Sequence, residues 1–363
     1  MRVWVIGAMT AALALTGCDR RPAEPDETDA APVAGTPVAD GRPDSATLTA
    51  IKRRGRLNCG VNQGLVGFAY TDNRGQWRGF DADFCRAVAA AVLGDGEAVR
   101  FVPLAATDRF SALAEGRIDV LWRNSSWTLS READEGFVFA GVNYYDGQGF
   151  LVRRALNLNS ATELNGARVC VQAGSNAQAG LDDFFRPRGV AYRAIVLPTE
   201  EAARDAYGRE DCDAFSADIS ALAAARTVLP NPQEHALLPE VVSKEPLGPV
   251  VRAGDERWVS VVRWTLNAVM LAEELGVTRD NAAALAKDSR DPAVRRLLGV
   301  DGDYGAMLGL KEDWAREAVE AVGNYGEIFE RNLGQGSPLN LERGLNAQWN
   351  ARPSGLIYGL PIR

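Results

Sequence analysis

Three short polar stretches carry the residues that could bind a charged small molecule. Arg131 ends the stretch 123–131, and its guanidinium could form a two-pronged pair with a carboxylate. The tripeptide Gly174-Ser175-Asn176 stands between a predicted strand and a predicted helix, where free backbone N–H groups suit an anion. Asp218 follows another predicted strand, and a carboxylate there could hold an ammonium group. Gathered in one cleft, these groups would complement a zwitterion.

Each of these residues also has an ordinary structural explanation. Arg131 could be a surface arginine at the start of a helix, and the tripeptide 174–176 could be a plain helix cap. Asp218 could cap the helix that follows it, because aspartate is favoured at that position. Capping and ligand binding do not exclude each other there. No convincing pair of general base and nucleophile accompanies the set, which favours binding over catalysis.

The composition narrows the class of function further. The 363 residues carry a formal net charge of −8, whereas a non-specific nucleic-acid binder is normally basic. A single histidine, His235, nearly excludes Ser-His-Asp or Cys-His catalysis and polyhistidine metal sites. No cofactor, no metal and no nucleic acid are therefore expected.

The elements that must position these groups alternate along the chain. Strands are predicted at 56–61, 99–103 and 118–122, with helices at 82–93 and from 107 to 116 between them. A second series has strands at 167–172, 191–197 and 213–217, with helices from 176, at 200–207 and at 218–227. This order predicts two α/β lobes with parallel sheets and crossover helices. Ligands of open α/β sheets bind beyond the carboxyl ends of the strands, where the three polar stretches lie.

Two further predictions concern helix boundaries. Asp81 is a plausible N-cap of the helix 82–93. From residue 255 onward the chain is predicted to be mostly helical, at 255–275, 279–287, 291–298 and 311–332. The segment 334–363 holds several glycines and prolines and is expected to be irregular.

The N-terminus has the pattern of an export signal. Arg2 precedes an apolar run at 3–15, which is too short to span a membrane comfortably. The sequence around Cys18 resembles the lipobox of bacterial lipoproteins, so residues 1–17 are expected to be a signal peptide and Cys18 to be lipidated; a plain signal peptide cleaved nearby is the alternative. Asp19 matches the aspartate that retains some such lipoproteins at the inner membrane. The remainder of 18–45 is rich in Pro, Ala and acidic residues and predicts a disordered linker.

Four cysteines remain after Cys18, an even number that suggests disulfides in an exported chain. Three pairings are possible. The pairing of Cys59 with Cys85 and of Cys170 with Cys212 keeps each bridge within one region, and free buried thiols are the alternative.

The folded part, from residue 46 to 363, resembles the bacterial extracellular solute-binding proteins of family 3, the receptors of ABC importers for polar amino acids. The resemblance lies in residues 79–84 (GFDADF) with the apolar positions after them, in 119–131 and in 213–218. Ala82 departs from the family pattern, in which a larger residue is usual. Segments 143–150, 243–249 and 321–332, with the four cysteines, resemble the subgroup of general L-amino-acid-binding proteins.

The resemblance implies roles for particular residues. Arg131 would bind the ligand α-carboxylate with help from Ser126 and the N–H groups near Ser175 and Asn176, and Asp218 would bind the α-amino group with Ser126 and the Asn124 carbonyl. Asn62 and Leu65 would line the side-chain pocket. Asn62 stands where basic-amino-acid binders often have an acidic residue, which argues against a strict lysine, arginine or histidine specialist. Whether Arg123 and Trp127 face the pocket stays open.

The resemblance also implies the architecture and the activity. We expect a two-lobed periplasmic binding protein fold with two hinge crossings, lobe 1 at 46–147 plus 248–363 and lobe 2 at 148–247. The protein would be a lipid-anchored periplasmic monomer that binds L-amino acids broadly, closes by a hinge and docks on a membrane permease; it would not be an enzyme. The alternative is a periplasmic dehydratase on the same fold, acting on a prephenate-like or arogenate-like acid.

Overall fold

A computed structural model describes residues 44–133 and 136–363. The predicted signal peptide, Cys18 and nearly all of the predicted linker lie outside the described residues. The described fold begins with helix α1 (Ala46–Arg54), whose first turn is capped by the Ser45 hydroxyl accepting from the Leu48 N–H at 2.9 Å. No helix between residues 44 and 363, the gap at 134–135 aside, combines the length and apolar character that a membrane crossing requires.

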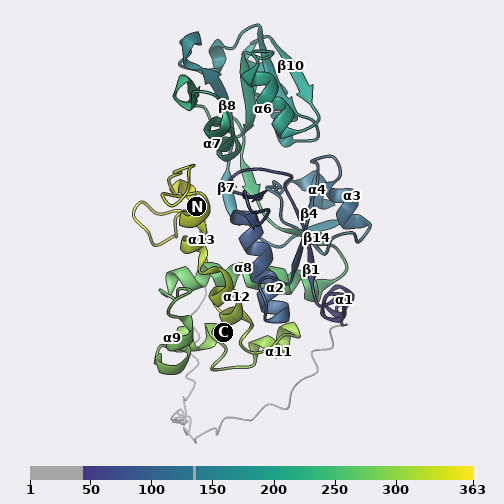
Figure 1. The fold of residues 1–363 in the computed structure, drawn as a ribbon, viewed down its shortest axis with the longest axis vertical. Helices are drawn as coiled ribbons and strands as arrows, with labels where there is room; N and C mark the ends of the chain where they lie inside the picture. Colours follow the sequence, from purple (N-terminus) through teal and green to yellow (C-terminus); the bar gives the residue numbers. More distant parts are fainter. Residues whose placement is uncertain (1–43, 134–135) are drawn as a thin grey trace, which may run out of the picture. The chain divides into compact units, whose positions relative to one another are not determined.

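The first sheet has the strand order β4-β1-β5-β14-β6. Its strands are β1 (Leu57–Val61), β4 (Val99–Pro103), β5 (Val120–Leu121), β6 (Phe137–Phe139) and β14 (Val250–Arg252). The strand β1 pairs in parallel with β4 and β5, as predicted, whereas β14 runs antiparallel to both β5 and β6. The sheet is therefore mixed, because a strand from residue 250 returns to it. Figure 1 shows α2 (Phe80–Leu93), α3 (Arg109–Ala114) and α8 (Glu256–Glu274) around this sheet.

The second sheet has the order β10-β9-β11-β8-β12. Its strands are β8 (Gln148–Arg153), β9 (Ala167–Gln172), β10 (Tyr192–Leu197), β11 (Ala214–Asp218) and β12 (His235–Leu237). Parallel pairing joins β10, β9 and β11, and β8 is antiparallel to β11 and β12. Helices α5 (Asn176–Phe185), α6 (Glu200–Gly208) and α7 (Ile219–Val228) follow its parallel strands.

The chain passes between the two sheets twice. Strand β7 (Tyr144–Asp146) leads into the second sheet and β13 (Glu245–Leu247) leads out of it, and the two pair antiparallel with Asp146 opposite Glu245. Two α/β units joined by two crossings are the architecture that the sequence predicted. We call the pair β7 and β13 the crossing strands.

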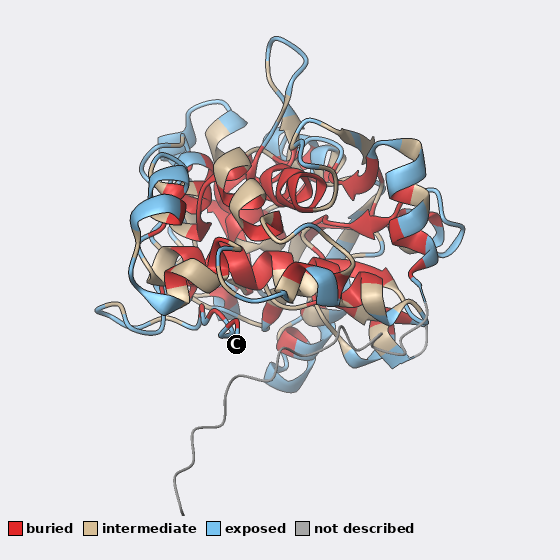
Figure 2. Cartoon of the chain, turned by 90° about the horizontal axis from the view of Figure 1, so that it is seen from below, coloured by how far each residue is buried: buried red, intermediate tan, exposed pale blue. Residues whose placement is uncertain are grey.

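Among the described residues, four clusters of buried apolar side chains form the cores: two lie in the second half, one lies in the first, and the largest lies mainly in the first. Figure 2 shows buried residues concentrated in the strands and in the inner faces of the helices. In the first half, the rings of Phe84 and Trp122 stack with centroids 5.0 Å apart, and Phe80 packs edge-on against Phe84. In the second, Phe150 and Phe185 form the centre of a distinct cluster. Each sheet thus has its own apolar core, which is the condition for an independently stable lobe.

The predicted capping role of Asp81 is wrong. Helix α2 begins at Phe80, two residues earlier than an N-cap at Asp81 would allow, and its N-cap is Gly79 with φ 121°. A Cβ at Gly79 would lie 2.1 Å from the Phe68 carbonyl oxygen, so only glycine fits there. Asp81 instead accepts a hydrogen bond from the Asn124 N–H at 3.0 Å.

The predicted helix 311–332 is also wrong, because the structure has two helices there. Helix α12 (Trp314–Val322) ends at Gly323, and α13 (Tyr325–Asn332) starts from a capping box between Asn324 and Glu327. The shorter helices are α9 (Ala282–Asp288), α10 (Pro292–Leu297) and α11 (Tyr304–Leu308), of which α11 was not predicted.

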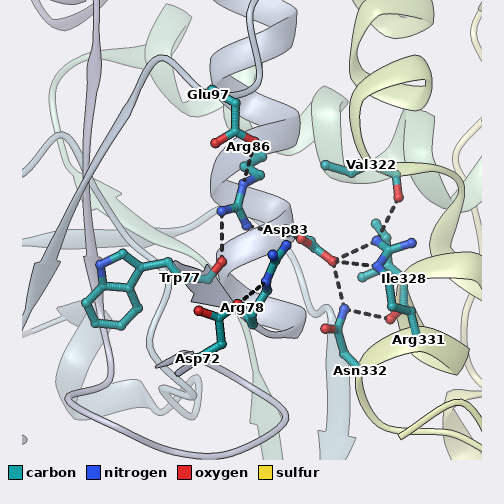
Figure 3. Close-up of polar contacts among 10 residues, drawn as sticks. All are labelled: Asp72, Trp77, Arg78, Asp83, Arg86, Glu97, Val322, Ile328, Arg331 and Asn332. Atoms are coloured by element: carbon teal, nitrogen blue, oxygen red, sulfur yellow. Dashed lines mark hydrogen bonds and ion pairs between the residues drawn. The ribbon is translucent and has the colours of Figure 1, made fainter. Parts of the chain in front are cut away.

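Asp83 of α2 fixes the last helix to the first sheet's core (Figure 3). Its Oδ2 accepts from Arg331 at 2.6 Å and from the Asn332 amide at 2.7 Å, and its Oδ1 accepts from Arg86 at 3.3 Å. The segment 334–363 that follows is irregular, as expected, with one 3₁₀ turn at Gly344–Asn346. Asn346 there bonds to both backbone groups of Tyr145 in β7, at 2.7 and 3.1 Å.

The remaining elements are small. They are the hairpin β2 (Tyr70–Thr71) and β3 (Trp77–Arg78), helix α4 (Leu129–Ala133) and 3₁₀ turns at 154–156, 161–163, 186–188 and 232–234. The two disulfides join Cys59 to Cys85 and Cys170 to Cys212, the pairing that the sequence favoured. Each stays within one half of the molecule.

Candidate ligand-binding site

Six of the eight predicted ligand residues line a single pocket of about 40 Å³. Asn124, Ser126 and Arg131 come from the first half. Ser175, Asn176 and Asp218 come from the second half and reach the same pocket. The pocket therefore lies between residues of the two sheets, at the carboxyl ends of β5, β9 and β11, where the topology predicted it.

Arg131 is buried rather than a surface residue. It lies on α4, the short helix after β5, and only 8% of its surface is exposed. Its Nη1 donates to the Ser126 carbonyl at 2.8 Å, and its guanidinium stands 5.4 Å from the centre of the Phe110 ring. These contacts fix the plane of the guanidinium, which prepares it to meet a planar carboxylate with little loss of side-chain freedom.

The start of α5 supplies backbone donors to the same pocket. Ser175 occupies the N-cap position, but its hydroxyl donates to the Gln172 carbonyl at 2.7 Å and does not cap the helix. The Asn176 amide donates to Glu245 at 3.0 Å. The N–H groups of the first turn have no cap from Ser175, so an anion at this end would find donors and the favourable end of the helix dipole.

Asp218 ends β11 and occupies the N-cap position of α7, yet its side chain makes no cap hydrogen bond. Burial raises the pKa of its carboxyl well above the usual range, and the nearby carboxylates of Asp146, Glu245 and Glu200 raise it further; Arg109 opposes them. A carboxylate in such surroundings is stabilised by a neighbouring cation, and a ligand ammonium group would be one.

Asn62 and Leu65 do not line this pocket. They line an adjoining pocket of about 250 Å³, to which the first pocket is linked by three shared residues, Arg123, Gln172 and Glu200. The Asn62 amide also donates to the Asn124 side chain at 3.1 Å. Polar and apolar residues contribute equally to the rest of the adjoining pocket. The polar ones are Gln63, Thr199, Glu201 and Arg204, and the apolar ones are Val66, Ala224, Ala225 and Val228, with Gly64 between them in character.

The structure places the two residues whose orientation the sequence left open. Arg123 is buried and lines both pockets, with its Nε donating to the Leu104 carbonyl at 2.9 Å. Burial lowers the pKa of Arg123 to about 10, although Glu200 and Asp81 oppose that shift, so the side chain is a cation at neutral pH. Trp127 lines neither pocket. Its ring stacks on Phe139 at 5.5 Å between centroids.

Sequence reasoning missed Arg109, Gln172 and Glu200, which also line the first pocket. Gln172 is the last residue of β9, so the rule on carboxyl ends of parallel strands could have found it. Glu200 opens α6 directly after β10, at the next such strand end. Arg109 opens α3 after β4. All three follow the same topological signal, which the search for complementary charges passed over.

Comparisons with known proteins agree with this geometry. Residues 57–281 match the model of the bacterial extracellular solute-binding proteins, family 3. The chain is 49% identical to a general L-amino acid-binding periplasmic protein of Rhizobium johnstonii, over 88% of this chain and 93% of the relative. It is 46% identical to a glutamate/glutamine/aspartate/asparagine-binding protein of Rhodobacter capsulatus, over 91% and 97%.

A solved structure extends the similarity to the fold. An ABC transporter periplasmic binding protein from Brucella ovis, with glutathione bound, superposes with a TM-score of 0.85 at 49% identity, covering 88% of this chain and all of that one. The family match at 57–281 contains every strand of both sheets and both crossings. The chain belongs to the bacterial extracellular solute-binding proteins, family 3.

Proposed function

We propose that this protein is the extracytoplasmic substrate-binding component of an ABC amino-acid importer and that it binds L-amino acids broadly. One observation carries the proposal: a pocket between the two sheets is lined by a buried arginine, by the start of α5 and by an aspartate whose side chain does not cap its own helix. Those groups match the two charges that every free amino acid carries. Relatives at 46–49% identity, named for binding amino acids, support it.

The head group of the ligand would be held from both halves. Arg131, Ser126 and the N–H groups near Ser175 and Asn176 would bind its carboxylate. Asp218 would bind its ammonium group, with Ser126 and the Asn124 carbonyl. Because each half satisfies part of the ligand, a closed arrangement of the lobes binds it better than an open one. We assign lobe 1 to residues 46–147 plus 248–363, lobe 2 to 148–247, and the hinge to the crossing strands.

The ligand side chain would extend into the adjoining pocket. Asn62 and Arg204 line it. Arg123 and Glu200 lie at its boundary with the pocket of about 40 Å³, which we call the head-group pocket. Amides and charges of both signs suit side chains that end in a carboxylate or an amide. Glutathione, which the structure from Brucella ovis contains, is a tripeptide whose γ-glutamyl residue carries a free α-amino and a free α-carboxylate group, with an extended polar chain beyond them. We therefore include it among the candidate ligands.

Binding without turnover is the proposed activity. Neither pocket is lined by a histidine or cysteine among the described residues. His235 lies elsewhere, in β12, with its Nδ1 2.8 Å from the Tyr207 hydroxyl. The dehydratase alternative requires a proton donor aimed at a leaving group, and the carboxylates of the pocket have the simpler role of holding an ammonium group.

The test is calorimetric titration of the purified protein with the twenty L-amino acids, glutathione and a prephenate-like acid. We expect binding of several L-amino acids, L-glutamate among them, with each ligand recovered unchanged. Arg131→Ala should weaken amino-acid binding by about tenfold or more, since it removes charge-assisted hydrogen bonds. Arg131→Lys keeps the charge without the two-pronged geometry, so its affinity should lie between those of wild type and Arg131→Ala.

Two results would contradict the proposal. Near-normal affinity of Arg131→Ala would mean that the carboxylate is bound elsewhere. Consumption of the prephenate-like acid, with no heat from any amino acid, would establish the dehydratase instead.

We further propose that the protein acts in the periplasm as a monomer, held to the membrane by a lipid on Cys18 and docking on permease subunits. The linker to residue 45 would let the lobes move freely near the membrane. Mass spectrometry of the exported protein tests the anchor: a diacylglyceryl group at residue 18 is expected, and its absence together with cleavage at another position would rule it out. A Cys18→Ala variant is the matched control.

A further inference from the structure

The N-terminus of α7 is capped by the crossing strand β7 and the residue after it. The N–H of Ile219 donates to the Gly147 carbonyl at 2.8 Å. The N–H of Ser220 donates to the Asp146 carboxylate, at 3.3 and 3.4 Å to its two oxygens, and the Ser220 hydroxyl donates to it as well. The first two N–H groups of the helix therefore find partners more than 70 positions earlier in the chain.

This arrangement leaves Asp218 without the role its position favours. An aspartate at an N-cap normally accepts from the second or third N–H of its own helix. The second N–H of α7 belongs to Ser220 and is directed to Asp146 instead. Asp218 makes no side-chain cap bond to its own helix, and its carboxylate lines the head-group pocket.

We propose that Asp146 is a positioning residue: by capping α7 in place of Asp218, it keeps the Asp218 carboxylate in the pocket for the ligand ammonium group. The proposal rests on the proposed function, because it assumes that Asp218 binds an amine. It also gives the crossing strand a part in recognition, since the residue that caps α7 lies where the chain passes between the lobes.

The second crossing strand makes a parallel contact. Glu245, opposite Asp146 in the β7–β13 pair, accepts from the Asn176 amide at 3.0 Å and from the Ser243 hydroxyl at 2.5 Å. Asn176 is the first residue of α5. The starts of α5 and α7 are thus both bonded to carboxylates of the crossing strands.

A simpler explanation is that Asp146 attracts the ligand ammonium only through its charge. Two substitutions separate the explanations. Asp146→Asn removes the charge but keeps an oxygen that can accept from Ser220, whereas Asp146→Ala removes both. If capping matters, Asp146→Ala frees the N–H of Ser220, and Asp218 turns back to cap its own helix. If only charge matters, the two variants lose affinity equally.

The experiment measures L-glutamate affinity by calorimetry in five proteins: wild type, Asp146→Asn, Asp146→Ala, Asp218→Asn and the double variant Asp146→Ala/Asp218→Asn. We expect a loss of about fivefold to tenfold for Asp146→Ala and of about threefold or less for Asp146→Asn. In the Asp218→Asn background the further effect of Asp146→Ala should vanish, because the carboxylate it positions is already gone.

Equal losses of affinity in Asp146→Asn and Asp146→Ala would overturn the proposal. So would an undiminished further loss of affinity when Asp146→Ala is added to Asp218→Asn. A wild-type protein that binds no amino acid would overturn the proposed function as well, so the two failures are distinguishable. If Asp146→Ala does not fold, Ser220→Ala replaces it: this variant removes only the hydroxyl contact and should give a smaller loss that also vanishes with Asp218→Asn. A loss that persists there rejects the positioning role.

Discussion

Asp81 is a buried carboxylate that supports the candidate site through the backbone of one of its residues. It accepts from the N–H of Asn124, a proposed ligand residue held at φ 24°, a conformation that asparagine tolerates better than most residues. Burial raises the pKa of Asp81 to about 6, although hydrogen bonds from Asn124 and Asn143 and the charge of Arg123 oppose the shift. The folded state thus favours the neutral form of this carboxyl over its charged form, compared with the same carboxyl in water.

This raised pKa predicts a specific pH dependence of stability. The folded-state pKa lies above the ordinary value of 3.8, so the contribution of Asp81 is fully present below that pH and is lost as the pH rises through 6. A rise of this size in the pKa corresponds to at most ~3 kcal/mol in the free energy of unfolding. Asp81→Asn keeps a hydrogen-bond acceptor for Asn124 and removes the titration.

Urea unfolding of wild type and Asp81→Asn between about pH 4 and pH 7 tests this expectation. The difference between their unfolding free energies should change by roughly 1 kcal/mol or more, in favour of Asp81→Asn, as the pH rises. A constant difference over that range would contradict it. Asp146, whose pKa burial also raises to about 6, is unchanged in both proteins and cancels in the comparison.

Residue types and strand ends pointed to Arg131, Ser175, Asn176 and Asp218, and the family resemblance added Asn124 and Ser126. All six line the pocket of about 40 Å³. The sequence could not predict the partners of Asp81 or Asp218, because local propensity makes both N-caps while their observed surroundings come from residues 43 and 72 positions away. Asp81 bonds to Asn124, and the capping of α7 falls to Asp146. Such partners are set by tertiary contacts between residues that are distant in the sequence.

Among the elements, Asn324 is the residue that separates two helices. Its side chain accepts from the Glu327 N–H at 2.9 Å and donates to the Val277 carbonyl at 2.8 Å, and the Glu327 carboxylate accepts from the Asn324 N–H at 2.9 Å. Gly323, at φ 85°, makes the turn before it. The apolar spacing continues across the break, which is why the sequence predicted one helix over 311–332.

Asn324→Ala should lower the free energy of unfolding by about 1–2 kcal/mol, because it removes a helix cap and leaves the buried Val277 carbonyl without that donor. Asn324→Asp is the matched control, since it keeps the cap and loses only the donor. Chemical denaturation of the three proteins gives the answer. An alanine variant as stable as wild type would show that the two helices need no stop signal between them.

Strands and helices with a clear period were predicted to within a residue or two. Ala167–Gln172 and Val99–Pro103 agree in full with their predictions. The place of β14 between β5 and β6 was not predictable, because three residues at 250–252 carry little periodic signal and their partners lie more than 110 positions earlier. The mixed character of the first sheet follows from that single strand.

At the scale of the whole molecule, the C-terminal segment binds the region where the lobes join. Asn346 pairs with both backbone groups of Tyr145 in β7, and the Gln348 amide donates to Glu273 of α8 at 2.9 Å. Glycine and proline content predicted an irregular segment but not its destination, because side-chain amides that bind backbone groups leave no pattern in the sequence. The segment anchors one crossing strand to the first half of the molecule.

Each disulfide lies within one half of the molecule, and the four cysteines that form the two bridges are fully buried. A small thiol reductant can therefore reach Cys59–Cys85 or Cys170–Cys212 only when the surrounding core opens, so the two reduction rates report separately how often each half unfolds locally.

An amino acid held by both halves should slow the reduction of both bridges, because it makes local unfolding of each half rarer. Quenching with an alkylating reagent, followed by peptide mass spectrometry, would record the two rates. A ligand held by one half alone would protect only the bridge on its own side. The half-lives of the two bridges during reduction thus show whether a ligand stabilises both halves of the molecule or only one.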